Sequence, residues 1–141
     1  MALYTIGVRT TNITAGNASC ELYTAATLGI RIWEIGICQL AAAAAVYGLG
    51  RPQAQGITPV PANFQAEQST ADPSAKTNIS LSWGTGPTTP LAFMRRAGTA
   101  LATSGVYWTF PRGLYVPASG SIVIWNITAG SAADVYFVID E

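Results

Sequence analysis

The chain has 141 residues, which is enough for one domain with its own core and short for two. Its seven basic residues balance seven acidic ones and only 10% of the residues are charged, so the composition predicts no nucleic-acid partner and no attraction to an anionic membrane. No run reaches the roughly 18 uninterrupted apolar residues of a membrane span, and the first residues lack the pattern of a signal peptide.

Alternating apolar and polar residues near the start of the chain predict β-strands. The pattern holds over residues 4–9 and 20–23, where side chains of one kind recur at every second position. Residues 30–37 (IRIWEIGI) form another apolar-rich segment, and their alternation slips at Ile32-Trp33, which predicts a β-bulge. Each segment is therefore expected to pack one face against a core.

An alanine-rich stretch, CQLAAAAAVYGL, covers residues 38–49. Alanine has the highest helix propensity, yet no capping residue precedes this run, and it follows a strand without a turn signal. We therefore expect residues 39–47 to continue the β-structure, bent near Gly36. Side chains this small would let a neighbouring sheet or subunit approach closely.

Residues 50–77 differ from the rest of the chain in composition, with prolines at positions 52, 59, 61 and 73 and little hydrophobic periodicity. A loop of this length inside a compact domain is uncommon and is usually functional, and its prolines favour extended backbone. Two interpretations stay open. The segment is either a surface excursion over the chain's own sheet or an arm that reaches a neighbouring subunit.

The second half of the chain contains further strand patterns. Residues 78–83 alternate, and residues 106–110 form a strand that Pro111-Arg112-Gly113 is expected to end. Residues 121–127 (SIVIWNI) and 134–140 (DVYFVID) are apolar on both faces. They are expected to form a hairpin in the sheet interior, or one whose outer side a neighbour covers.

These patterns give eight or nine strands and no confident helix, so the predicted fold is all-β. We expect a single antiparallel β-sandwich, jelly-roll-like rather than immunoglobulin-like, with one long Pro-rich loop. Cys20 and Cys38 lie in strand-like surroundings, and buried free thiols are favoured there over a disulfide.

The sequence offers little catalytic chemistry. It has no histidine, which is both the commonest general base and the commonest metal ligand. Its seven acids show no paired arrangement typical of glycosidases or calcium sites, so we expect no enzyme, no metal and no cofactor. The four tryptophans lie within strand patterns, where core packing is favoured over a platform for sugar stacking.

The short β-rich chain, its low charge, its lack of histidine and its Pro-rich segment resemble small β-sandwich cement or decoration proteins of tailed-bacteriophage capsids. RIWEIG (residues 31–36) and the ending IVIWNITAGSAADVYFVIDE (residues 122–141) have the same character. The resemblance implies a jelly-roll-like homotrimer on the outer capsid surface of the virion. Its partner would be the major capsid protein, whose subunit seams it would bridge.

Candidate interface residues follow from composition and position. Small side chains allow close approach, the Pro-rich segment could form an arm, and arginine, which outnumbers lysine six to one, is the cation favoured at protein interfaces. The alternative function is a carbohydrate- or receptor-binding module, of the kind found in lectins or at phage fibre tips. The interface candidates are Ala41, Ala43, Ala45, Arg51, Pro52, Pro59, Pro61, Phe64, Arg95, Arg96 and Arg112.

Overall fold

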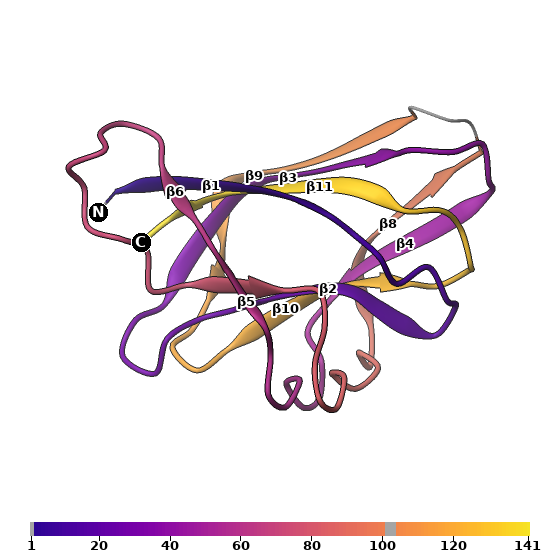
Figure 1. Ribbon diagram of the computed structural model, residues 1–141, viewed down its shortest axis with the longest axis horizontal. Coiled ribbons are helices and arrows are strands. Elements are labelled where there is room, and N and C mark those ends of the chain that lie inside the picture. Colours follow the sequence, from indigo (N-terminus) through magenta and orange to yellow (C-terminus); the bar gives the residue numbers. More distant parts are fainter. Residues whose placement is uncertain (1, 101–103) are drawn as a thin grey trace.

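A computed structural model describes residues 2–100 and 104–141 of the chain. Strands and connecting loops make up all of this part, and two sheets face each other across it (Figure 1). No helix in it has the length and apolar character needed to cross a membrane. The strands are β1 (Leu3–Arg9), β2 (Asn17–Tyr23), β3 (Ile30–Gln39), β4 (Ala45–Gly50), β5 (Pro61–Asn63), β6 (Gln65–Ala66), β7 (Asn78–Ser80), β8 (Phe93–Thr99), β9 (Gly105–Val116), β10 (Ser121–Asn126) and β11 (Ala133–Asp140).

The predicted all-β sandwich is confirmed, because the two antiparallel sheets pack against each other. The first sheet has the strand order β6-β1-β11-β3-β9, and the second has the order β5-β7-β2-β10-β4-β8. Consecutive long strands lie in opposite sheets, except that β4 and β8 share the second sheet. Thus β1, β3, β9 and β11 belong to the first sheet, whereas β2, β4, β8 and β10 belong to the second.

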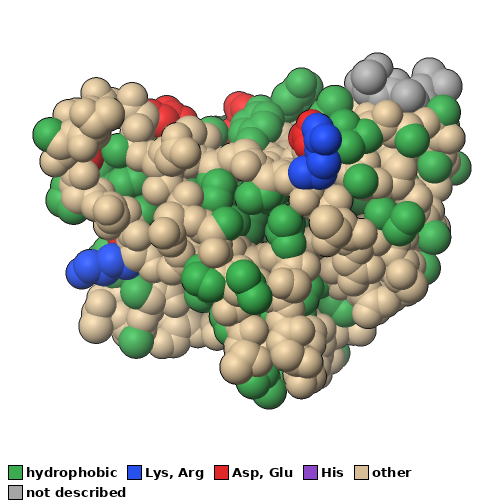
Figure 2. Space-filling view, viewed as in Figure 1, with side chains coloured by type: hydrophobic (Ala, Val, Ile, Leu, Met, Phe, Trp, Pro, Cys, Tyr) green, Lys and Arg blue, Asp and Glu red, His purple; other side chains and the backbone are tan. Residues whose placement is uncertain are grey.

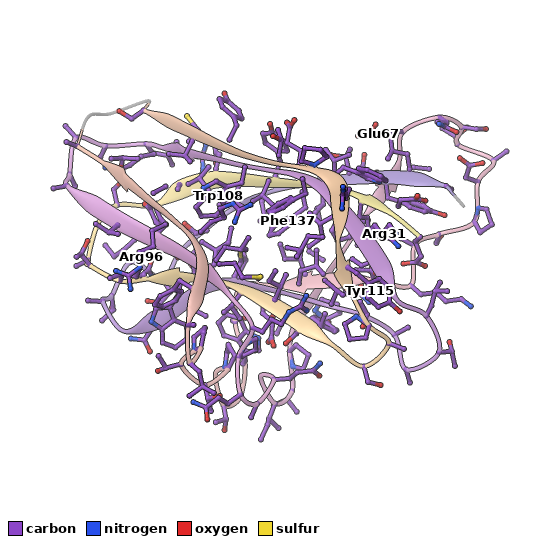
Figure 3. The ribbon with its side chains drawn as sticks, turned by 180° about the vertical axis from the view of Figure 1, so that it is seen from behind. Arg31, Glu67, Arg96, Trp108, Tyr115 and Phe137 are labelled. Atoms are coloured by element: carbon purple, nitrogen blue, oxygen red, sulfur yellow. The ribbon has the colours of Figure 1, made fainter. Side chains whose placement is uncertain are left out.

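The core lies between the inner faces of the two sheets. Phe137 and Trp108 point into this space from the first sheet (Figure 3), and Leu22 and Ile124 close it from the second. All but Trp108 are fully buried, so they contribute about 2 kcal/mol each relative to exposure. Cys20 and Cys38 are free thiols, and burial raises the pKa of Cys20 to about 12, which makes this thiol unreactive.

The predicted bulge in β3 is confirmed, whereas the β-structure predicted for residues 39–47 is present at both ends of that stretch and interrupted at residues 40–44. Pairing of β3 with both neighbours shifts register where Trp33 is skipped. The strand then ends at Gln39, and residues 40–44 form a bend that leads into the other sheet. The buried Gln39 amide donates hydrogen bonds to the carbonyls of Ala41 (2.7 Å) and Ala43, which satisfies backbone groups that a continuing strand would have paired.

Two predictions about the later strands are also wrong. β10 and β11 do not form a hairpin, because the link between them crosses from the second sheet to the first. β9 does not end at Pro111 but continues to Val116 through an irregularity in its pairing with β3. Proline is tolerated there because β9 is an edge strand, and Gly113 adopts a positive φ of 67° that favours glycine.

The Pro-rich segment runs along the chain's own body. Two short strands, β5 and β6, add it to the edges of the second and first sheets in turn, and Phe64 between them is buried in the core. The part before β5, residues 51–60, lies beside residues 84–92 at the lower edge of Figure 1. We call these two loops together the loop tip.

Candidate functional site

A groove of about 590 Å³ lies on the outer face of the first sheet. One cross-strand row forms its centre. In neighbouring strands Gly7 pairs with Tyr136, Tyr136 pairs with Gly36, and Gly36 pairs with Tyr107. Because all four residues point to the same side of the sheet, glycines alternate with tyrosines across four strands.

The glycines of this row have different roles. A Cβ on Gly36 would lie 2.0 Å from Cε1 of Tyr136, so this glycine lets the Tyr136 ring lie flat across β3. A Cβ on Gly7 would meet nothing within 4 Å, so open space remains above that position. Tyr107 rises at the other end of the row, 66% exposed, with its ring centroid 6.3 Å from that of Tyr136.

Polar groups flank the tyrosines on both sides. The Tyr136 hydroxyl donates a hydrogen bond to Glu34, and burial together with this carboxylate raises the pKa of Tyr136. On the other side Arg9 donates to Asp134 through two nitrogens, at 2.8 and 3.1 Å. This ion pair raises the pKa of Arg9 and lowers that of Asp134, so both groups stay charged at neutral pH.

The loop tip is the second prominent surface. It exposes three large aliphatic side chains, Ile57 at 62%, Val60 at 63% and Leu91 at 86%. Its two loops contain a single charged residue, Arg51, and on the face shown in Figure 2 the lower edge of the molecule carries only hydrophobic and uncharged atoms. Such a charge-poor apolar surface has the composition of an interface core.

Backbone hydrogen bonds hold the two loops of the tip together. Ile57 N–H donates to the Thr85 carbonyl at 2.8 Å, and Ala54 N–H donates to the Thr88 hydroxyl at 2.7 Å. Thr88 N–H returns a bond to the Ala54 carbonyl at 3.1 Å. The tip therefore presents its apolar side chains from a fixed backbone.

A buried carboxylate attaches the loop tip to the second sheet. Glu21 lies in β2 between the buried residues Cys20 and Leu22 and is itself only 1% exposed. It accepts hydrogen bonds from the Trp83 indole N–H at 2.8 Å and from the Gly56 N–H at 3.1 Å. Burial raises its pKa, whereas the Ser121 hydroxyl, the Gly56 N–H and the Trp83 N–H act in the opposite direction.

Only part of the predicted interface set is available to a partner. Ala45 and Phe64 are buried in the chain's own core, so they present no surface. Ala41 is exposed and Ala43 half-buried in the bend after β3. The exposed or half-buried residues in and beside the loop tip are Arg51, Pro52, Pro59 and Pro61, and the exposed arginines of β8 and β9 are Arg95, Arg96 and Arg112.

The described residues include no cluster of potential metal ligands. Among residues 2–100 and 104–141, no three His, Cys, Asp or Glu side chains are placed to hold a metal ion. Of the tryptophans, Trp108 and Trp125 are buried, while Trp33 and Trp83 are half-buried. The sequence analysis missed the groove, whose available signal was glycine at the outward positions 7 and 36 of two strands.

Comparison with known proteins gives no relative from which a function could be transferred. No family model matches the chain, and no curated protein and no solved structure matches it either.

Proposed function

We propose that the protein is a capsid decoration protein, which binds across seams between major capsid protein subunits and stabilises the shell. The observation that carries this proposal is the loop tip, with three exposed aliphatic side chains, one charged residue and a fixed backbone. The resemblance of the sequence to phage cement proteins supports the choice of partner. Two packed antiparallel sheets are an architecture that jelly rolls share, and the jelly roll is the fold that the resemblance implies.

The loop tip is suited to binding a partner at a low cost in conformational entropy. Large exposed apolar groups at a pre-ordered surface lose little conformational freedom when a partner covers them. A protein that binds the assembled shell but not the separated subunits stabilises the shell by mass action. Many copies on one shell would add their contributions, so each copy needs only a modest interface.

The test is co-sedimentation with shells assembled from the major capsid protein encoded by the same genome. Wild-type protein should sediment with the shells and raise the temperature at which they disrupt. Ile57→Asp should weaken binding about tenfold or more, because it places a charge at the centre of the apolar tip.

The matched control is Ile13→Asp, the same substitution at a 42% exposed isoleucine in the loop between β1 and β2. It should bind as the wild type does. Equal binding of the two variants would exclude the loop tip as the contact surface. Failure of the wild-type protein to sediment with the shells would overturn the function itself.

A further inference from the structure

We propose that the groove on the outer face of the first sheet binds a neutral oligosaccharide. The first sheet, which carries the groove, lies on the upper side of Figure 1, whereas the loop tip lies at the lower edge. The inference is therefore independent of the proposed capsid contact, and each can fail without the other.

The shape of the groove fits a ligand of a few sugar rings. Its volume of about 590 Å³ lies within the range of small-molecule sites. The floor is open above Gly7 at one end of the row, and Tyr107 stands at the other end with two-thirds of its surface exposed. One pyranose ring could therefore rest on the sheet backbone at Gly7 beside Tyr136, and a further ring of the same oligosaccharide could reach Tyr107.

The side chains that line the groove match both the apolar C–H face and the polar hydroxyl groups of a sugar. The Tyr107 and Tyr136 rings offer apolar faces to the C–H side of a pyranose. Charged groups that both donate and accept hydrogen bonds stand beside these rings. The Arg9–Asp134 pair is 64% and 49% exposed, so its remaining N–H groups and lone pairs are available to neighbouring hydroxyls. The Glu34 carboxylate adds an acceptor next to Tyr136.

Other occupants fit less well. An anionic ligand would need a free cation, but Arg9, the cation of the lining, is already paired with Asp134. An extended peptide binds through free backbone groups at a sheet edge, whereas the central strands of this groove, β11 and β3, are paired on both sides. A second copy placed face to face would set one hollow against another and leave unfilled space.

The test uses saturation-transfer NMR with maltotriose, cellotriose, mannotriose and chitotriose as probes. We expect at least one probe to bind with a dissociation constant of about 1 mM. Tyr107→Ala should weaken that binding about tenfold. Its control is Tyr115→Ala, which removes another exposed tyrosine of the same strand that does not line the groove.

A second variant tests the floor of the groove. Gly7→Val should abolish binding without disturbing the fold, because its side chain would enter space that is empty in the free protein. Gly86→Val is the matched control, since a Cβ there also meets nothing within 4 Å but the residue lies in the loop tip. Absence of binding by all four probes would overturn the proposal, as would binding that survives both Tyr107→Ala and Gly7→Val.

Discussion

The outer faces of the two sheets differ in what covers them. On the second sheet Val123 and Trp125 of β10 form a small apolar cluster, and Trp83 and Phe93 pack over it. Every residue of β10 is buried as a result. On the first sheet β11 alternates instead between buried residues and residues that are exposed or half-buried, and the groove lies over its outer side.

This difference shows that a strand apolar on both faces does not by itself predict a subunit interface. The outward side chains of β10 are covered by loops of the same chain, which Glu21 holds against the second sheet through Gly56 and Trp83. The first sheet receives no such cover over Tyr107, which stays 66% exposed. The open face and the loop tip are therefore two surfaces that the described part of the chain leaves uncovered.

The largest expected effect comes from removing one aromatic side chain from each outer face. Trp83→Ala should lower the free energy of unfolding by about 3 kcal/mol, because it opens the apolar cover and leaves the buried Glu21 without its indole donor. Tyr107→Ala should change it by less than about 0.5 kcal/mol, since this side chain is largely exposed. Urea denaturation measures both, and equal losses would contradict the contrast between covered and open faces.

Adding one methyl group to a glycine at the covered face and to a glycine on the open face gives a finer comparison. Gly56→Ala places a Cβ 2.1 Å from Cδ1 of Trp83, so the loop or the indole must move, at a cost of about 2 kcal/mol. Gly7→Ala meets nothing within 4 Å and should leave stability unchanged or slightly raised. Thermal melts monitored by circular dichroism compare the two, and a Gly56→Ala protein as stable as the wild type would disprove the tight contact.

The sequence predicted the fold class well, because alternation directly reports which residues face a core. The slip at Trp33 also identified the bulge in β3. The prediction from sequence failed at residues 40–44, where the chain crosses from the first sheet to the second. The bend after Gln39 depends on a buried side-chain amide that binds backbone carbonyls, and alanines carry no turn signal of their own.

The candidate surfaces were less predictable, since both depend on residues far apart in the chain. The groove combines Gly7, Gly36, Tyr107 and Tyr136 from four strands, and only the strand order makes them neighbours. For the same reason Phe64 looked like part of an arm, whereas β5 and β6 carry it into the core.

The smallest expected effect is the pH dependence that Glu21 gives to the covered face. Burial raises the pKa of Glu21 above its ordinary 4.5, so the folded chain holds this proton to a higher pH than the unfolded chain does. The stability from this difference is complete below 4.5 and is lost as the pH rises through the folded-state pKa. Glu21→Gln cannot titrate, so its unfolding free energy relative to wild type should increase with pH over that window and then level off.

Denaturation of both proteins in urea across this pH range measures the difference. Glu67→Gln is the control, because it makes the same substitution at an exposed carboxylate in the Pro-rich segment. A difference in unfolding free energy between Glu21→Gln and wild type that does not change with pH would mean that the Glu21 carboxyl has the same pKa in the folded and the unfolded chain. The attachment of the loop tip would then depend on the packing of Trp83, and the covered face would be held by apolar contact without a contribution from the buried charge.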